Sequence, residues 1–282
     1  MKASLLVSDW ALTPSVVVPV AASALLYLAA TRRAAGRWPR RRTASFLAGL
    51  ACLLIALQSG IDAYDDRLLS VHMVQHMLIL LLAPLLLHGG RPVILALSAL
   101  PPEHRRRPAR LFARTRSLTS PLAALAAFAA VVVLTHLPAF YDAAVRHDWI
   151  HYAEHLLYLL AGLLMWSPLI DGDPAPRHRL SGLGRLGYLI VAMLPMALVG
   201  AYLNRYASLA YPAYGPPAHA LGISALNDQA QAGAIMWVVG NSIMVAVGLW
   251  AALAAMVAEE RRLLAREGRS APLAPSDRSG AV

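Results

Sequence analysis

Residues 72–77 read HMVQHM and begin an apolar run that continues to residue 87. Such a run is typical of a helix that crosses a membrane. On that helix His72 and His76 stand four residues apart, so their rings lie on one face. Ionisable side chains at the end of a membrane span are costly and usually serve a function. The stretch therefore predicts a membrane helix with a candidate site in its first turn.

Residues 147–155 read HDWIHYAEH and begin a second apolar run of the same kind. At about 100° per residue, four polar side chains of this stretch fall within one arc of about 100° on a helix. These side chains are His147, His151, Glu154 and His155. A carboxylate one turn inside a span needs a partner, and a metal ion, a histidine or Arg146 could provide one. Two helices are thus predicted to carry polar stripes at one end.

The composition is that of a polytopic membrane protein. The 282 residues are 58% hydrophobic and only 14% charged, whereas soluble domains carry about 25% charged residues. The net charge of +10 comes mainly from arginines in short segments between apolar runs, so membrane topology explains it better than nucleic-acid binding does. Cys52 is the only cysteine, which excludes an intrachain disulfide and a cysteine-based metal motif.

Seven apolar segments are long enough to cross a bilayer, which takes about 17 to 25 helical residues. The sequence therefore predicts an all-α bundle of seven transmembrane helices. The expected spans are residues 13–30, 43–60, 71–87, 120–137, 150–169, 186–203 and 229–257. We expect residues 1–258 to form this membrane domain and residues 259–282 to form a disordered tail rich in proline, serine and alanine.

Arginine placement predicts the orientation of the bundle. Of the 25 lysines and arginines, 21 follow the first, third, fifth or seventh span, and only Lys2, Arg67, Arg146 and Arg205 fall on the other side. The positive-inside rule then places the N-terminus outside and the C-terminus in the cytoplasm. In this topology seven of the ten histidines lie on the outer face. The uncharged loop 206–227, rich in tyrosine, proline and glycine, is expected to cap that face.

These histidines predict a shared metal site just below the outer surface, because neutral imidazole is the commonest metal ligand. The alternative is that each histidine merely reaches water or hydrogen-bonds a carbonyl, as lone interfacial histidines usually do. Pairs four residues apart on separate helices favour the shared site. The predicted ligands are His72, His76, His136, His151 and His155. Additional ligands or groups that orient the imidazoles are expected among Glu154, Asp62, Asp142, His147, Met73 and Met77, although both methionines point away from the histidines on a helical wheel and suit a core position better.

Several motifs together resemble the membrane-integral CtaG family, whose members are assembly factors for caa-type cytochrome c oxidase. The motifs are HMVQHM at 72–77 with Ala83-Pro84, THLPAFYDAA at 135–144, HYAEH at 151–155 with Gly162 and WSP at 166–168, and Asp228-Gln229 with Gly233 and IMW at 235–237. The resemblance implies a seven-span protein of the bacterial plasma membrane that helps an oxidase mature, with copper delivery or insertion as its task. Oxidase subunits or other assembly factors would be its partners, and self-association is left open.

The chemistry of the site leaves several alternatives to copper. Histidine-rich sites bind Cu(II) tightly, whereas Cu(I) prefers thiolates and thioethers. A b-type haem could use His76 and His155 as axial ligands. A membrane zinc hydrolase could use three histidines with Glu154 as general base. A chaperone without any metal is the third alternative, and a non-enzymatic role is the main expectation.

Overall fold

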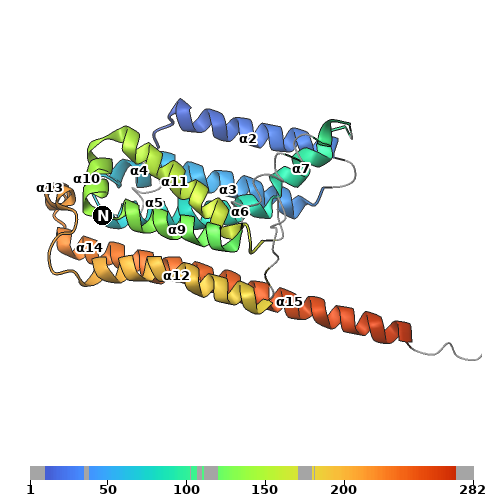
Figure 1. The fold of residues 1–282 in the computed structure, drawn as a ribbon. Helices are drawn as coiled ribbons and strands as arrows, with labels where there is room; N and C mark the ends of the chain where they lie inside the picture. Colours follow the sequence, from blue (N-terminus) through green and yellow to red (C-terminus); the bar gives the residue numbers. More distant parts are fainter. Residues whose placement is uncertain are drawn as a thin grey trace, which may run out of the picture.

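The protein is described by a computed structural model over residues 10–34, 38–101, 103–106, 110, 120–170, 180 and 182–270. Over these ranges the chain is helical between its connections and contains no strand, which confirms the all-α prediction. Most helices run along one common direction (Figure 1). In chain order they are α2 (Pro14–Arg33), α3 (Arg40–Gln58), α4 (Gly60–Tyr64), α5 (Leu69–Met77), η1 (Leu78–Leu82), α6 (Ala83–Gly89), α7 (Pro92–Ala99), α9 (Pro121–Thr135), α10 (Pro138–Arg146), α11 (Asp148–Trp166), α12 (Gly182–Arg205), η3 (Pro212–Tyr214), α13 (Gly215–Ala220), α14 (Ala225–Ala234), η4 (Ile235–Val239) and α15 (Gly240–Ser270).

A helix occurs at each of the seven predicted positions, but not all of these helices have the length and hydropathy of a membrane span. Five continuous helical segments do, namely Pro14–Arg33, Arg40–Tyr64, Leu69–Ala99, Gly182–Arg205 and Ala225–Ala254. The pair α9 and α10 makes a sixth if its 71° bend is counted within one span. α11 is not among them, because four ionisable residues occupy its first two turns. Seven membrane spans and the orientation of the termini remain predictions.

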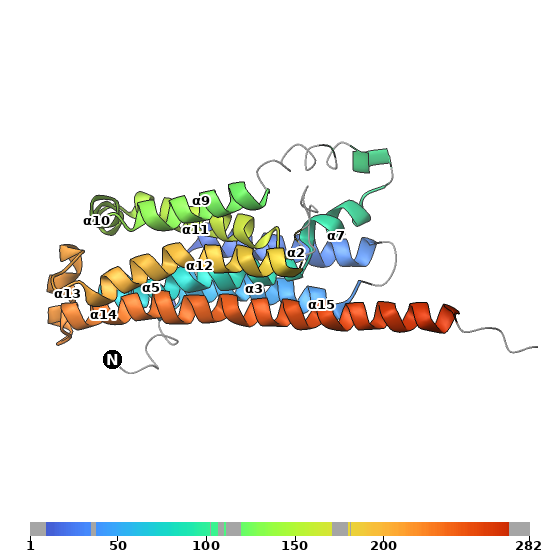
Figure 2. The same ribbon diagram turned by 60° about the horizontal axis from the view of Figure 1, so that its bottom comes forward.

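The last helix is longer than the sequence indicated. α14, η4 and α15 run on from one another, and α15 continues beyond the rest of the bundle (Figure 2). Residues 259–270, expected to belong to a disordered tail, are part of this helix, which ends at Ser270. Residues 271–282 lie outside the described residues. The division into a membrane domain and a tail stays a prediction.

The π-helix η1, which directly follows α5, provides the contact that aligns α11 with α5. Pro84 has no N–H to bond the Leu80 carbonyl, and the preceding turn widens into the π-helix η1. Gly162 of α11 lies directly against the Leu80 carbonyl, because it has no Cβ. Trp166 closes the same contact by donating its indole N–H to the Leu81 carbonyl at 2.9 Å. The histidine-bearing first turns of α11 are thereby held opposite α5.

The first turns of α5 and α11 and the last turn of α9 lie at one end of the bundle, which we call the histidine end. Short elements, among them α10 and α13, lie at this end (Figure 1). The chain bends by 71° between α9 and α10, where Leu137 is extended and Pro138 begins α10. α7 lies at the opposite end (Figure 1), after Arg91 breaks the preceding helix with a left-handed backbone, φ 49°.

Candidate metal centre

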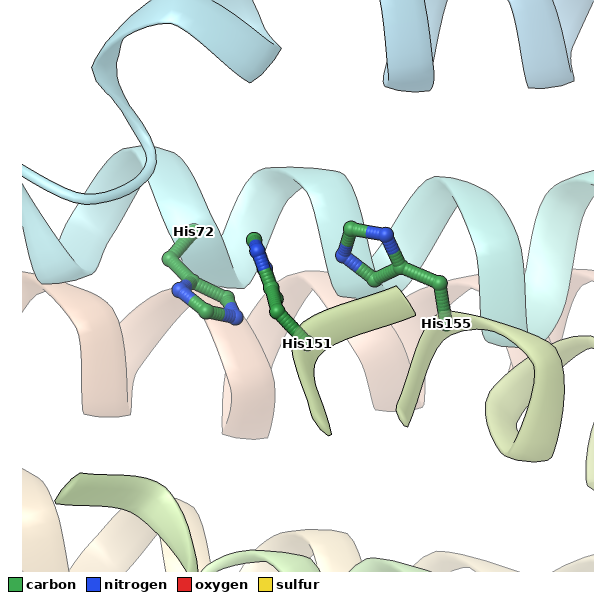
Figure 3. Close-up of side chains that lie close together, drawn as sticks. All are labelled: His72, His151 and His155. Atoms are coloured by element: carbon green, nitrogen blue, oxygen red, sulfur yellow. The ribbon is translucent and has the colours of Figure 1, made fainter. Parts of the chain in front are cut away.

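Five imidazole rings from three helices lie together at the histidine end. α5 provides His72 and His76, the residue capping α9 is His136, and α11 provides His151 and His155. Centroids of neighbouring rings are 4.1 to 6.4 Å apart. Figure 3 shows the His151 ring between those of His72 and His155. Four of the five residues are buried, and the His151 side chain is 18% exposed.

A hydrogen-bonded chain fixes which nitrogen of His72 carries the proton. The Tyr214 hydroxyl donates to the Asp65 carbonyl at 3.0 Å, and burial raises the pKa of Tyr214, so the hydroxyl keeps its proton. Its oxygen must then accept from His72 Nδ1, which lies 2.6 Å away. The lone pair of His72 is therefore on Nε2, which faces His76 Nε2 at 2.6 Å. His76 donates in that contact and keeps its own lone pair on Nδ1.

Carbonyl acceptors set the tautomers of two other rings. His136 Nδ1 lies 2.8 Å from the Val132 carbonyl, so this nitrogen carries the proton and Nε2 carries the lone pair. Gln75 uses its amide nitrogen for the Ala56 carbonyl and for Asp62, and therefore turns its oxygen towards His155 Nε2 at 3.1 Å. His155 then donates from Nε2 and keeps a lone pair on Nδ1. Such outer contacts orient metal-binding histidines in known metal sites.

Buried electron-pair donors without a partner gather among these rings. Over the described residues, hydrogen-bond partners are lacking for His76 Nδ1, His136 Nε2, His151 Nε2, Asp65 Oδ2 and both oxygens of Glu154. Burying such groups unpaired is unfavourable. The tautomers above make the His76 and His136 atoms acceptors, and Glu154, with no exposed surface, adds a carboxylate. A cation bound among them would satisfy several of these atoms, so the residues fit a metal ion.

Asp65, in the turn before α5, adds an acidic group on the α11 side of the cluster. Its Oδ2 lies 3.7 Å from His151 Nε2. Burial, reinforced by Asp62, raises the pKa of the Asp65 carboxyl to about 8. A nearby positive charge would lower that pKa again. Asp65 thus strengthens the preference of the site for a cation.

Two sets of three donors are compact enough to hold one ion each. In one set, which we call the His151 set, the ligand atoms of His72, His151 and His155 all lie within 4.8 Å of one another. In the other, which we call the Glu154 set, those of His72, His76 and Glu154 do so. All three residues of the Glu154 set are buried, and only His151 in the other set is partly exposed. His72 belongs to both sets.

A comparison of the sequence with models of protein families shows which family the chain belongs to. The model of the cytochrome c oxidase caa3 assembly factor family, Caa3_CtaG, matches residues 25–258. The chain belongs to the Caa3_CtaG family. This result confirms the resemblance seen in the sequence motifs, and the matched region includes every residue of both donor sets.

Curated relatives of this Caa3_CtaG protein occur in mycobacteria. It is 34% identical over 258 residues to the uncharacterized proteins Mb0105 of Mycobacterium bovis and MT0111 of Mycobacterium tuberculosis, and 30% identical over 250 residues to ML1998 of Mycobacterium leprae. These alignments cover 85–86% of the chain but only 38% of each relative. The chain thus spans well under half the length of these relatives. No solved structure matches it.

Four residues predicted as additional ligands lie apart from the donor atoms of this Caa3_CtaG site. His147 caps α11 with an exposed side chain. Asp142 pairs with Arg146 at 3.6 Å instead of with an imidazole. Met73 and Met77 are buried in the apolar core, as their helical angles indicated. Asp62 does act behind the cluster, through Gln75.

Several supporting groups were not among the predicted site residues. Gln75 lies between the two histidines of HMVQHM, but on a helical wheel it is about 60° from His72 and about 100° from His76, so the local pattern does not single it out. Asp65 precedes α5 by only four residues, but its carboxyl approaches the partner helix α11. Tyr214 comes from a loop 142 residues away from His72, and no local pattern indicates that contact.

Proposed function

We propose that this Caa3_CtaG protein binds a transition-metal ion, copper by preference, among the histidines and provides it during assembly of a cytochrome c oxidase. The observation that carries the proposal is the set of buried nitrogen and oxygen atoms without hydrogen-bond partners on His76, His136, His151 and Glu154. Buried polar groups are normally paired, and here the missing partner is a cation. An assembly factor that presents a metal need not catalyse a reaction.

The donor types favour copper among the candidate metals. Imidazole nitrogens and a carboxylate bind Cu(II) most tightly of the divalent first-row ions. Cu(I) prefers sulfur ligands. Met73 and Met77, however, are buried in the apolar core, and Cys52 belongs to α3, a different helix from those that carry the histidines. The protein would therefore hold copper in its oxidised form when no partner supplies sulfur.

The position of the cluster suits exchange at a membrane surface. From the arginine distribution we infer that the histidine end faces the extracytoplasmic side of a bacterial plasma membrane. The partly exposed His151 would then face that side, where an oxidase subunit or another assembly factor could take the ion. The segments α10 and α13 at this end are the natural candidates for contact with such a partner.

The test is metal analysis of the purified protein in detergent after loading with Cu(II) and removal of free copper. We expect about one copper per chain. A double variant, His76→Ala with His155→Ala, removes one ligand from each donor set and should retain almost none. The matched double variant, His147→Ala with His219→Ala, removes two exposed histidines and should bind as the wild type does. Equal copper in both double variants would overturn the proposal.

The same preparation separates the alternatives. Zinc in the isolated protein, with no gain of copper on loading, would favour a zinc site. An absorption band at the Soret position would favour haem. Protein that is folded and binds none of the three would point to an assembly factor that works without a metal.

A further inference from the structure

The two donor sets have one ligand in common, and that ligand can serve only one ion at a time. His72 donates its Nδ1 proton to the Tyr214 hydroxyl, whose own proton goes to the Asp65 carbonyl. Only His72 Nε2 is left with a lone pair. An ion held through this nitrogen by the His151 set cannot simultaneously be held through it by the Glu154 set.

Resting on the proposed function, we propose that His72 is a pivot on which a single metal ion moves between two positions. In the first position the ion is bound by His72, His151 and His155. In the second it is bound by His72, His76 and Glu154. The ion exchanges His151 and His155 for His76 and Glu154 while the bond to His72 is kept. No electron is transferred, and the ion changes only its ligands.

The solvent exposure of the ligands indicates which of the two positions an incoming ion occupies first. The His151 side chain is 18% exposed, and Glu154 has no exposed surface. An incoming ion therefore meets the His151 set first. Asp65, 3.7 Å from His151, places a carboxyl group on this side as well. The Glu154 set lies deeper, because Glu154 and His76 are both fully buried.

The carboxylate of Glu154 favours the second, deeper position of the ion. The His151 set offers three neutral nitrogens, whereas the Glu154 set offers two nitrogens and a carboxylate. An opposite charge offsets the cost of holding a cation in a buried site better than a neutral ligand does. Both oxygens of Glu154 are buried and lack a partner at hydrogen-bond geometry among the described residues, so a bound cation would compensate for their burial.

Copper loading of the wild-type protein tests the sequence of events directly. Stopped-flow absorption and freeze-quenched electron paramagnetic resonance would follow Cu(II) binding in detergent. We expect an early signal from nitrogen ligands alone, which then converts to a mixed nitrogen and oxygen signal at a constant one copper per chain. A single signal that never changes, or two coppers per chain, would overturn the pivot. No copper at all would overturn the proposed function and the pivot with it.

Variants separate the two positions. Glu154→Gln should bind one copper and stop at the nitrogen-only signal. His151→Ala should bind one copper more slowly and show only the mixed signal. His72→Ala, which removes the common ligand, should retain less than a tenth of the copper. Thermal unfolding in detergent checks that each variant is folded, and His147→Ala is the matched control. Loss of copper in folded Glu154→Gln and His151→Ala alike would indicate one undivided site and contradict the proposal.

Discussion

The carboxylate of Asp228 in α14 accepts a hydrogen bond from the backbone N–H of Leu69, the first residue of α5, at 2.7 Å. It also accepts from Ser70 through both the backbone N–H, at 3.3 Å, and the hydroxyl. The residue preceding α5 provides no side-chain cap of its own. A residue 159 positions away therefore caps the helix that carries His72 and His76.

Asp228→Ala should lower the free energy of unfolding by about 1–3 kcal/mol, because it leaves buried N–H groups of α5 unpaired. Copper affinity should fall as well, since the first turn of α5 carries His72. Thermal unfolding in detergent and copper competition measure the two effects. Glu260→Ala is the control, because Glu260 is an exposed acidic residue on α15. Equal behaviour of the two variants would show that the cap is unimportant.

Tyr214→Phe tests the hydrogen-bonded chain that fixes the His72 proton. The ring would stay in place, but His72 Nδ1 would lose its acceptor, so the proton would no longer be held on that nitrogen. Removing an outer partner of a metal-binding histidine costs about 10–100-fold in affinity, and we expect a loss in that range for Cu(II). The exposed Tyr206 provides the control, Tyr206→Phe, whose affinity should equal that of the wild type. An unchanged affinity in Tyr214→Phe would argue against the assigned tautomer.

Gly162→Ala tests the contact that aligns α11 with α5. A Cβ at this position would meet the Leu80 carbonyl at less than the closest normal approach, with backbone that cannot simply rotate away. We expect destabilisation of about 1–3 kcal/mol, as for other overpacked sites. The same change at exposed Gly187 meets nothing within 4 Å and should stabilise the helix by about 0.5–1 kcal/mol. Opposite shifts of the unfolding temperature are the expected result, and shifts of equal sign and size would contradict it.

The sequence predicted well those parts of the molecule that depend on local pattern. Apolar runs located helices at all seven positions, and the spacing of His72 and His76, and of His151 and His155, predicted which rings share a helix face. Two differences between prediction and structure have physical causes. The ionisable residues in the first two turns of α11 lower its hydropathy, so the helix by itself lacks the hydropathy of a membrane span, and the fifth span stays a prediction. The end of α15 was misjudged because charged residues continue a helix as readily as they end it.

The groups that support the site depend on tertiary structure, which the sequence does not display. Asp228 was noticed only as part of a family motif, and its role as a cap requires α14 to lie beside the start of α5. Its neighbour Gln229 accepts from the Ala210 N–H at 2.7 Å and donates to the Ser208 carbonyl at 3.0 Å. This pair of residues therefore fixes both α5 and the loop that leads to Tyr214. Local pattern identifies candidate ligands, and long-range hydrogen bonds determine how they are oriented.

Gln75→Leu tests the group that orients His155. The replacement keeps an apolar side chain of similar size but removes the acceptor of His155 Nε2 and the link to Asp62. The unpaired buried N–H should cost about 1–3 kcal/mol of unfolding free energy. Copper affinity should fall about 10–100-fold, chiefly at the early nitrogen-only stage, because His155 belongs to the His151 set.

The matched control is Gln231→Leu, at an exposed position of α14, which should change neither quantity. Combining Gln75→Leu with Glu154→Gln gives the sharper measurement. Glu154→Gln confines copper to the set that contains His155, so the loss caused by Gln75→Leu should be larger in that background than in the wild type. If the loss were the same in both backgrounds, Gln75 would act on the fold as a whole and not through His155.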